Sequence, residues 1–360
     1  MGIKGLYEYL KKKYKHKLLS YEDLTGKLIY VDLSLYVFKY TCVRIDTKTL
    51  YRRLYLLQTG EELDAAIVPN VDEILQTTTP ENIDKAFREI VSERVQNLIE
   101  LQIMKFRRYD ILTPYIIDGP AHPLKEKTVA KRKELLKKDR DEVEAVLADA
   151  VENLKITLDV DENRIVIETG TVNPLTSYVE KICKTPQAYI GKWIFDIAED
   201  KLRSLGVKLI YAPNDSEAYG SWLSHNATYM CEDRSPDHVE KYHTEFDCGE
   251  ICGKHREVFG ILTEDGDSLV FGAKNVLRVC KEEGMFNVYN THDVLIALGI
   301  SQQQFIDMCI CMGCDYTNGI HGMGPVKSHE QLMLNGFIKG LSDIPFYDEI
   351  VAYFRHMDLQ

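Results

Sequence analysis

The chain has 360 residues, 45% of them hydrophobic and 28% charged, which is enough to bury one large core or two smaller ones. No run of about 18 apolar residues occurs, and lysines interrupt the first residues, so we expect neither a membrane span nor a secretory signal. Nine cysteines, an odd number in a chain of this length, indicate reduced thiols in an intracellular protein, nuclear or cytoplasmic.

The formal net charge of −12 hides two basic segments. Residues 1–20 carry six lysines against one acid, and residues 125–140 carry eight Lys or Arg against three acids. A solvated helix face explains a single basic run. Part of the acid excess, however, lies at strand ends where bound cations would offset it. The local patches therefore indicate the partner better than the whole-chain charge does, and a nucleic acid is not excluded.

Four strand-like runs along the chain end in carboxylates. They are residues 28–31 before Asp32, 115–117 before Asp118, 207–211 before Asp215 and Glu217, and 258–262 before Asp265 and Asp267. Buried parallel strands deliver ligands at their carboxyl ends, and the last of these runs is the strongest example. A solvated turn explains one Asp-x-Asp pair, whereas four strands that end in this way predict a metal site.

Helices are expected between these strands. A basic amphipathic helix follows Gly2, which lacks a side chain and lets the terminus lie against packed protein or a phosphate. A short helix is expected at 33–40 and a less regular insertion at 44–82. An amphipathic helix is expected at 82–107, with Leu101 on its apolar face.

The basic segment after Asp118 reads as a helix. Lys125 and Arg132 are seven residues apart, about two helical turns, so both side chains would project from one face. That face would present two cations to whatever the carboxylates bind. Further on, residues 141–186 are weakly patterned and are expected to be helical, with a strand near 164–167. A helix over 186–205 ends before a glycine.

An inserted segment after Glu217 gathers cysteines and histidines. They are Cys231, His238, His243, Cys248, Cys252 and His255. Zinc uses such ligands, with Cys231, Cys248 and Cys252 as the candidate thiolates, but the spacing matches no standard zinc knuckle. An insertion loop with ordinary thiols and imidazoles is the alternative.

The C-terminal part reads as a helix–turn–helix. An apolar helix over 305–312 precedes Asp315, and a glycine-punctuated turn at 319–325 precedes a polar helix from Val326. The backbone N–H groups that such a turn exposes at a helix start suit a phosphate.

Together these motifs resemble the flap endonuclease family of structure-specific 5′ nucleases, the Rad2/XPG-like enzymes. The motifs come in the family's order and cover the nuclease core. They are Met1-Gly2-Ile3-Lys4-Gly5-Leu6, Val31-Asp32, Ile117-Asp118-Gly119, Ala212-Pro213-Asn214-Asp215-Ser216-Glu217-Ala218, Thr263-Glu264-Asp265-Gly266-Asp267, Gly313-Cys314-Asp315-Tyr316 and Gly322-Met323-Gly324-Pro325.

The resemblance implies a set of site residues. Its metal-site acids fall on Asp32, Asp118, Asp215, Glu217, Asp265, Asp267 and Asp315. Its catalytic lysine and arginine fall on Lys125 and Arg132, and its base-stacking aromatic residue falls on Phe38. Other DNA-binding positions fall on Gly2, Gly322, Gly324 and Lys327. Asp215 stands where the family usually has Glu, so the carboxylate is kept with a shorter reach.

The turn that grips duplex DNA in the family departs from the pattern here. His321 and Val326 replace two basic residues and leave Lys327. Gly319 replaces a hydroxyl that helps to hold a monovalent cation, so a cation at the 319–324 turn would lack that ligand. No sliding-clamp motif precedes Gln360.

The expected fold is α/β. A PIN-like nuclease core with a central, mainly parallel sheet would span 1–300, with insertions near 44–82 and 226–256. A helix–turn–helix module that binds duplex DNA would span 301–360.

The expected activity is that of a Mg²⁺-dependent 5′ flap endonuclease and 5′–3′ exonuclease, acting in DNA replication, repair or recombination. Two Mg²⁺ ions, or Mn²⁺ in their place, would be held by the acids. The partner would be branched or flapped DNA, and the chain would be a monomer.

A predominantly 5′–3′ exonuclease or a junction resolvase is the alternative within the family. A catalytically silent DNA-binding scaffold is the alternative from another class, and the presence of all seven acids argues against it. A PIN-type ribonuclease would share the carboxylates but lack the glycine turn.

Overall fold

The computed structural model describes residues 2–64, 67, 70–159, 173–186, 191–226, 229–231, 255–282 and 284–355. The chain divides into two compact units. The first comprises Met1–Tyr36, Glu100–Val129 and Leu202–Gln360, and the second comprises Val37–Ile99 and Ala130–Lys201. The boundary expected after residue 300 falls inside the first unit, so the sheet and the C-terminal helices belong to one compact body.

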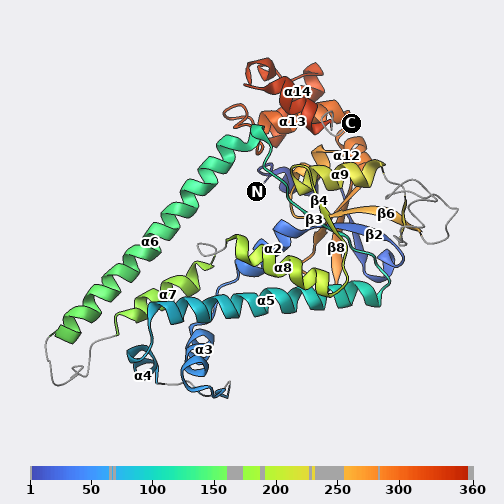
Figure 1. The fold of residues 1–360 in the computed structure, drawn as a ribbon. Helices are drawn as coiled ribbons and strands as arrows, with labels where there is room; N and C mark the ends of the chain where they lie inside the picture. The colour runs from blue at the N-terminus through green and yellow to red at the C-terminus, as the bar shows by residue number, and fades with distance from the viewer. Residues whose placement is uncertain are drawn as a thin grey trace. The chain divides into compact units, whose positions relative to one another are not determined.

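The first unit is built on one mixed sheet with the strand order β1–β8–β7–β6–β2–β3–β4, and β5 pairs with β6 beside this path. Figure 1 labels β2, β3, β4, β6 and β8 of this sheet. β2, β3, β4, β6 and β7 are parallel, whereas β8 is antiparallel to both β7 and β1. The strands are β1 Lys17–Ser20, β2 Leu28–Asp32, β3 Tyr115–Ile117, β4 Leu209–Tyr211, β5 Tyr229–Cys231, β6 His255–Leu262, β7 Asn275–Val279 and β8 Met285–Asn290. The prediction of a mainly parallel sheet is confirmed.

β2 and β6 lie in the middle of the sheet because their side chains are suited to burial on both faces. All five residues of β2 are buried, as are Val258, Ile261 and Leu262 of β6. Helix α9 (Ser216–Asn226) packs on β6 and β2. Since β2, β3, β4 and β6 are parallel, their carboxyl ends share one edge of the sheet.

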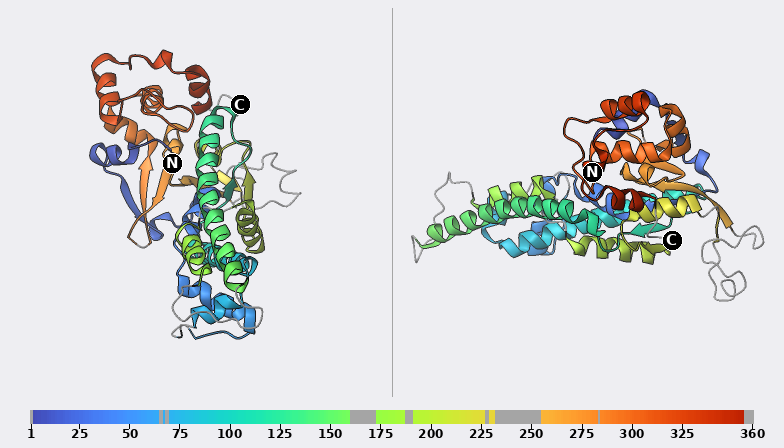
Figure 2. Two further views of the ribbon diagram at one scale, coloured as in Figure 1. Left: turned by 90° about the vertical axis from the view of Figure 1, so that its left-hand side faces the viewer. Right: turned by 90° about the horizontal axis from the view of Figure 1, so that it is seen from above.

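The C-terminal helices of the first unit pack on one another, and Figure 2 shows them grouped together in orange and red. Helix α13 begins after Ser301, whose hydroxyl accepts a hydrogen bond from Gln304 N in a capping box. The other helical elements are α1 Leu6–Lys13, η1 Glu22–Leu24, η2 Pro123–Lys125, α11 Asp267–Val270, α12 Thr291–Leu298, α13 Gln302–Met312, α14 Pro325–Asn335, η5 Leu341–Asp343 and α15 Tyr347–Phe354. The predicted helix–turn–helix is formed by α13 and α14.

Among the described residues, no single helix is long and apolar enough to cross a membrane. Helices α12 and α13 meet that criterion only when they are taken together, and the chain bends by 82° between them.

The second unit is helical. It contains α3 Thr47–Thr59, α4 Val71–Gln76 and α7 Leu175–Lys184, whereas α2 Leu33–Thr41, α5 Pro80–Arg108, α6 Glu126–Asp159 and α8 Lys192–Ser204 contain residues of both units. The expectation of a less regular insertion at 44–82 was wrong for α3 and α4. Leu50, Leu54 and Ile74 are buried there and anchor the two helices.

Four other predictions are corrected or fall outside the described residues. The helix predicted at 82–107 is confirmed as α5, but Leu101 is 55% exposed, because Ile99 and Ile103 take the buried positions. The helix predicted from 186 begins only at Lys192. The strand predicted near 164–167 and the candidate zinc ligands Cys248 and Cys252, together with His238 and His243, lie outside the described residues.

Candidate active site

The seven predicted acids all belong to the first unit, and most come from the carboxyl ends of its parallel strands. Asp32 ends β2, Asp118 follows β3, Asp215 and Glu217 follow β4, Asp265 and Asp267 follow β6, and Asp315 follows α13. All are buried except Asp118, which is exposed. Buried acids are rare unless they are paired or bind a metal.

Lys125 brings three of these acids around one positive charge. Its Nζ lies 2.8 Å from Glu217 Oε1, 3.0 Å from Asp215 Oδ2 and 3.8 Å from Asp315 Oδ2. Burial alone would lower the pKa of Lys125, but the carboxylates of Glu217 and Asp215 raise it above its ordinary value. Lys125 therefore stays charged although it is only 5% exposed.

Lys125 ends the 3-10 turn η2, and α6 begins one residue later. The prediction that Lys125 and Arg132 share one face of a single helix is therefore not met, because only Arg132 lies within α6. Arg132 is half-buried and belongs to the second unit.

Hydroxyl groups hold Asp32 and Asp118 in place. Ser216 Oγ donates to Asp32 Oδ1 at 3.0 Å, and Thr263 Oγ1 donates to Asp32 Oδ2 at 3.0 Å. Ser216 N donates to Asp118 Oδ1 at 2.7 Å, and the Ser34 hydroxyl donates to Asp118 Oδ2. Ser216 thus links the acids at the ends of β2 and β3.

Asp265 and Asp267 form a tight turn beside the N-terminus. Asp267 N donates to Asp265 Oδ1 at 2.9 Å. Gly2 lies against the pair, since a Cβ on Gly2 would come within 2.0 Å of Asp265 Oδ1, and its φ of +72° favours glycine. The predicted close approach at Gly2 is therefore made to protein. Asp267 is fully buried, and neither of its carboxylate oxygens has a hydrogen-bond partner among the described residues.

Burial and mutual repulsion raise the pKa values of these carboxyls. Burial, followed by the charge of Asp118, raises the pKa of Asp32 to about 7. Burial raises the pKa of Glu217 to about 8, although Lys125 opposes the shift. Burial and the charges of Asp265 and Asp315 raise the pKa of Asp267 well above its usual range. Lys125 alone does not neutralise the cluster.

A divalent cation fits the donor chemistry of this cluster. Carboxylate oxygens are the ligands that Mg²⁺ and Mn²⁺ prefer, and the two unpartnered oxygens of Asp267 are available to a cation. Among the residues that the structure describes, no three acidic, histidine or cysteine side chains are already grouped closely enough to enclose a metal ion. The ammonium group of Lys125 lies among Asp215, Glu217 and Asp315, where it supplies part of the positive charge that a cation would supply.

The residues predicted to bind DNA are dispersed. Phe38 belongs to the second unit and packs edge-on against Phe195, with ring centroids 5.9 Å apart. Gly324 precedes the first residue of α14, and Lys327 is exposed in its first turn. A Cβ on Gly319 would meet Cys311 O at 2.4 Å and Gly313 N at 2.5 Å, so this backbone has no room for the hydroxyl side chain that the resemblance implies.

Several side chains that hold the acids were not predicted. Ser216 and Tyr316 each adjoin an acid in a quoted motif, so their positions were available from the sequence. Tyr353, which donates to Asp215 Oδ2, is 138 residues away along the chain, and no sequence pattern connects them.

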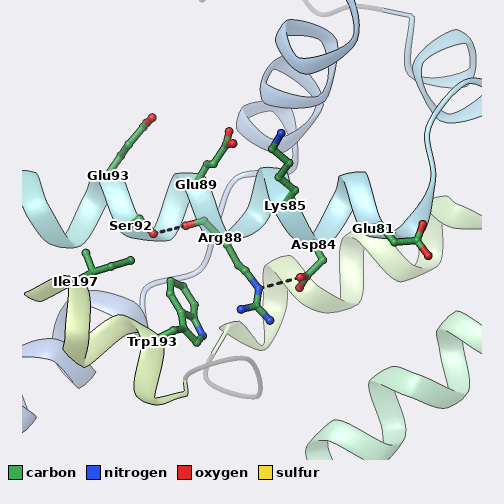
Figure 3. A pocket seen from close by; sticks show the side chains of 9 residues that line it. All are labelled: Glu81, Asp84, Lys85, Arg88, Glu89, Ser92, Glu93, Trp193 and Ile197. Carbon is green, nitrogen blue, oxygen red and sulfur yellow. Dashed lines mark hydrogen bonds and ion pairs between the residues drawn. The ribbon is translucent and has the colours of Figure 1, made fainter.

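A pocket in the second unit contains none of these acids (Figure 3). It is lined by residues of α5 and α8. Arg88 Nε contacts Asp84 Oδ2 at 2.8 Å, and Arg88 Cζ lies 5.3 Å from the centroid of the Trp193 ring. Asp84 thus pairs with the positive charge of Arg88, and Arg88 in turn covers a face of the Trp193 ring.

Comparisons with known proteins find one family model, related sequences and solved structures that resemble this chain. The family model of the XPG I-region matches residues 241–315, which include Asp265, Asp267 and Asp315. Flap endonuclease 1-B of Sorghum bicolor is 25% identical over 354 residues, covering 94% of this chain and 67% of the relative. Flap endonuclease 1 of Chlamydomonas reinhardtii is 24% identical over 347 residues, covering 95% of this chain and 66% of the relative. The chain thus spans about two thirds of the length of these relatives.

Two solved structures share the fold. The catalytic core of Rad2 in complex with DNA substrate superposes with a TM-score of 0.50 at 17% identity, covering 100% of this chain and 76% of that chain. Human GEN1 in complex with Holliday junction DNA gives a TM-score of 0.50 at 15% identity, covering 98% of this chain and 66% of that chain.

The parallel sheet, with acids at its carboxyl edge, gives an α/β, PIN-like fold that is shared with the catalytic core of Rad2. The XPG I-region match and the alignments over most of its length make the chain similar to flap endonucleases.

Proposed function

We propose that the chain is a structure-specific 5′ nuclease that hydrolyses phosphodiester bonds in DNA at 5′ flaps or single/double-strand junctions, with divalent cations as cofactors. The observation that carries this proposal is the buried Asp267 carboxylate, unpartnered among the described residues, within a cluster of acids that one lysine does not neutralise. A DNA-binding scaffold without catalytic activity would not need a buried acid cluster that destabilises the folded chain.

Each part of the site has a role in this chemistry. Asp32, Glu217, Asp265 and Asp267 would hold the cations, with Asp118, Asp215 and Asp315 completing the carboxylate set. When bound, a pair of divalent cations supplies an attacking hydroxide and neutralises charge on the phosphate and the leaving oxygen. Lys125, held by the same carboxylates, would stabilise negative charge that develops on the phosphate oxygens. The family resemblance assigns to Arg132 the role of a bidentate donor.

Substrate recognition is proposed to rest on the N-terminal and C-terminal motifs. Gly2 would let the chain start approach the scissile region, and the exposed backbone of the α13–α14 turn, with Lys327, would contact duplex phosphate. Mg²⁺ is the proposed ion, with Mn²⁺ able to replace it.

The test is cleavage of end-labelled flap, nicked, blunt and four-way-junction DNAs, with matched RNA, in Mg²⁺, Mn²⁺ or a chelator. We expect metal-dependent cuts near the flap junction by the natural chain and none by Asp267→Asn. Equal cleavage by both proteins, or cleavage of RNA alone, would overturn the proposal.

A further inference from the structure

Three donors converge on one oxygen of Asp215. Tyr353 OH donates to Asp215 Oδ2 at 2.8 Å, and Tyr316 OH donates to the same atom at 3.2 Å. Lys125 Nζ lies 3.0 Å from it. None of these contacts engages Oδ1, so the hydroxyl pair and the ammonium group fix the rotation of the carboxylate and leave its other oxygen for a cation.

Tyr353 comes from α15, the last helix that the structure describes, and its ring is held firmly. It is 2% exposed and makes edge-on contacts with Phe271 and Tyr316, with ring centroids 5.3 Å apart in each case. Burial and the Asp215 carboxylate raise the pKa of Tyr353, so its hydroxyl remains a donor.

The same ring also touches the segment that carries Lys125. His122 stacks on Tyr353 with centroids 4.0 Å apart and planes inclined by 23°. His122 O accepts a hydrogen bond from Lys125 N at 2.8 Å, and its ring Nδ1 accepts one from Leu124 N at 3.3 Å. Tyr353 therefore contacts both an acid of the cluster and the turn that delivers the lysine into it.

We propose that Tyr353 is a positioning residue for divalent-cation binding, because its hydroxyl holds Asp215 in the orientation that the cation needs and so makes metal affinity depend on α15. The inference rests on the proposed function, in which the acid cluster binds divalent cations. Outer partners that orient a metal ligand typically contribute on the order of 10- to 100-fold to metal affinity.

Packing is the competing explanation, and the chain offers a matched control. Tyr353→Phe keeps the ring and its contacts but removes the hydroxyl. Tyr347→Phe makes the same change in the same helix, where Tyr347 OH donates to Asp307 Oδ1 at 2.7 Å, and Asp307 is not one of the seven acids. If Tyr353→Phe weakened metal binding only by destabilising α15, Tyr347→Phe would weaken metal binding as well.

The experiment measures Mn²⁺ binding to the full chain without DNA, by electron paramagnetic resonance of free Mn²⁺, beside thermal unfolding of each variant. We expect Tyr353→Phe to weaken Mn²⁺ binding about tenfold, and Tyr347→Phe to bind like the natural chain. In an Asp215→Ala background, Tyr353→Phe should cause no further loss, because its acceptor is gone. In cleavage assays, Tyr353→Phe should need about tenfold more Mn²⁺ and recover most of its rate at saturation.

Unchanged Mn²⁺ affinity in Tyr353→Phe would overturn the inference. So would equal losses in both phenylalanine variants, or a loss that persists undiminished in the Asp215→Ala background. Because binding is measured without DNA, a natural chain that binds Mn²⁺ through Tyr353-dependent Asp215 but cuts no substrate would contradict the proposed function alone.

Discussion

Asp267 shows at the scale of one residue why we propose the acid cluster as the functional site. It is completely buried, both carboxylate oxygens lack a hydrogen-bond partner among the described residues, and burial raises its pKa. An ionised carboxylate in that position destabilises the folded chain unless a cation neutralises it. Removing the charge should therefore stabilise the metal-free protein while it removes a ligand.

Asp267→Asn is expected to abolish cleavage and to raise the melting temperature of the metal-free protein at neutral pH. DNA binding in Ca²⁺ should survive or tighten, because a negative charge near phosphate is lost. Asp141→Asn, an exposed acid on α6, is the control and should change none of these. Near-normal turnover of Asp267→Asn would remove Asp267 from the metal site.

Lys125→Ala is expected to lower the single-turnover cleavage rate on the order of 10²-fold, as the loss of one preorganised donor typically does. Affinity for DNA should fall much less, because Lys125 is buried against Glu217 and Asp215 instead of lying on an open surface. Lys127→Ala removes an exposed lysine two residues away and serves as the control. A fall in affinity that matches the fall in rate would assign Lys125 to backbone binding only.

The acids were predictable residue by residue, whereas their partners were not. A carboxylate at the end of a buried parallel strand has a place fixed by the strand, so the positions of Asp32, Asp118 and Asp265 at strand ends could be predicted from the sequence. The contact between Tyr353 and Asp215 depends on how α15 folds back on the core, and neither residue carries a local signal for it.

At the scale of elements, the turn between α13 and α14 departs from the resemblance for a steric reason. Gly319 has φ +70°, and a Cβ there would meet Cys311 O at 2.4 Å, whereas Gly322 has φ +77° and open space around its Cα. A hydroxyl residue at 319 therefore conflicts with the backbone that this chain adopts.

Gly319→Ser, which restores the hydroxyl implied by the resemblance, is expected to lower the melting temperature instead of creating a cation site. Gly322→Ser suffers only the left-handed backbone penalty of about 1–2 kcal/mol and is the control. Thermal unfolding with and without K⁺ distinguishes the two cases. If Gly319→Ser were as stable as Gly322→Ser and were stabilised by K⁺, the turn would accommodate the cation after all.

The prediction of helices succeeded where a regular apolar spacing dominated the segment. It failed where buried and exposed positions could not be told apart from the spacing of apolar residues. The apolar spacing of α5 was evident, yet Leu101 was placed on the wrong face because Ile99 and Ile103 continue the buried stripe on either side of it. α3 escaped recognition because Arg52 and Arg53 interrupt its buried positions Leu50 and Leu54. Local composition does not reveal which of these faces the rest of the chain covers.

At the scale of the whole molecule, the net charge of −12 conceals how the charges are arranged. The parallel strands place carboxylates at one edge of the sheet, where they lie close enough to repel one another. The pKa of Asp32 is raised to about 7 and that of Glu217 to about 8, so both side chains take up protons in the folded chain at a higher pH than they do in the unfolded chain. Stability should therefore depend on both pH and divalent cations.

The free energy of unfolding of the metal-free protein is expected to fall as pH rises from about 5 to about 8. In the unfolded chain both carboxyls have pKa values near 4. The folded state therefore binds more protons than the unfolded state in that window, and stability is lost as pH rises through the folded pKa values. On the proposed function, Ca²⁺ should bind only the folded, deprotonated cluster and so restore more stability at the high end than at the low end. Chemical denaturation across this range measures the slope, and Asp32→Asn/Glu217→Gln should flatten it. A slope equal in the natural chain and the double variant would show that these two carboxyls do not carry the pH dependence.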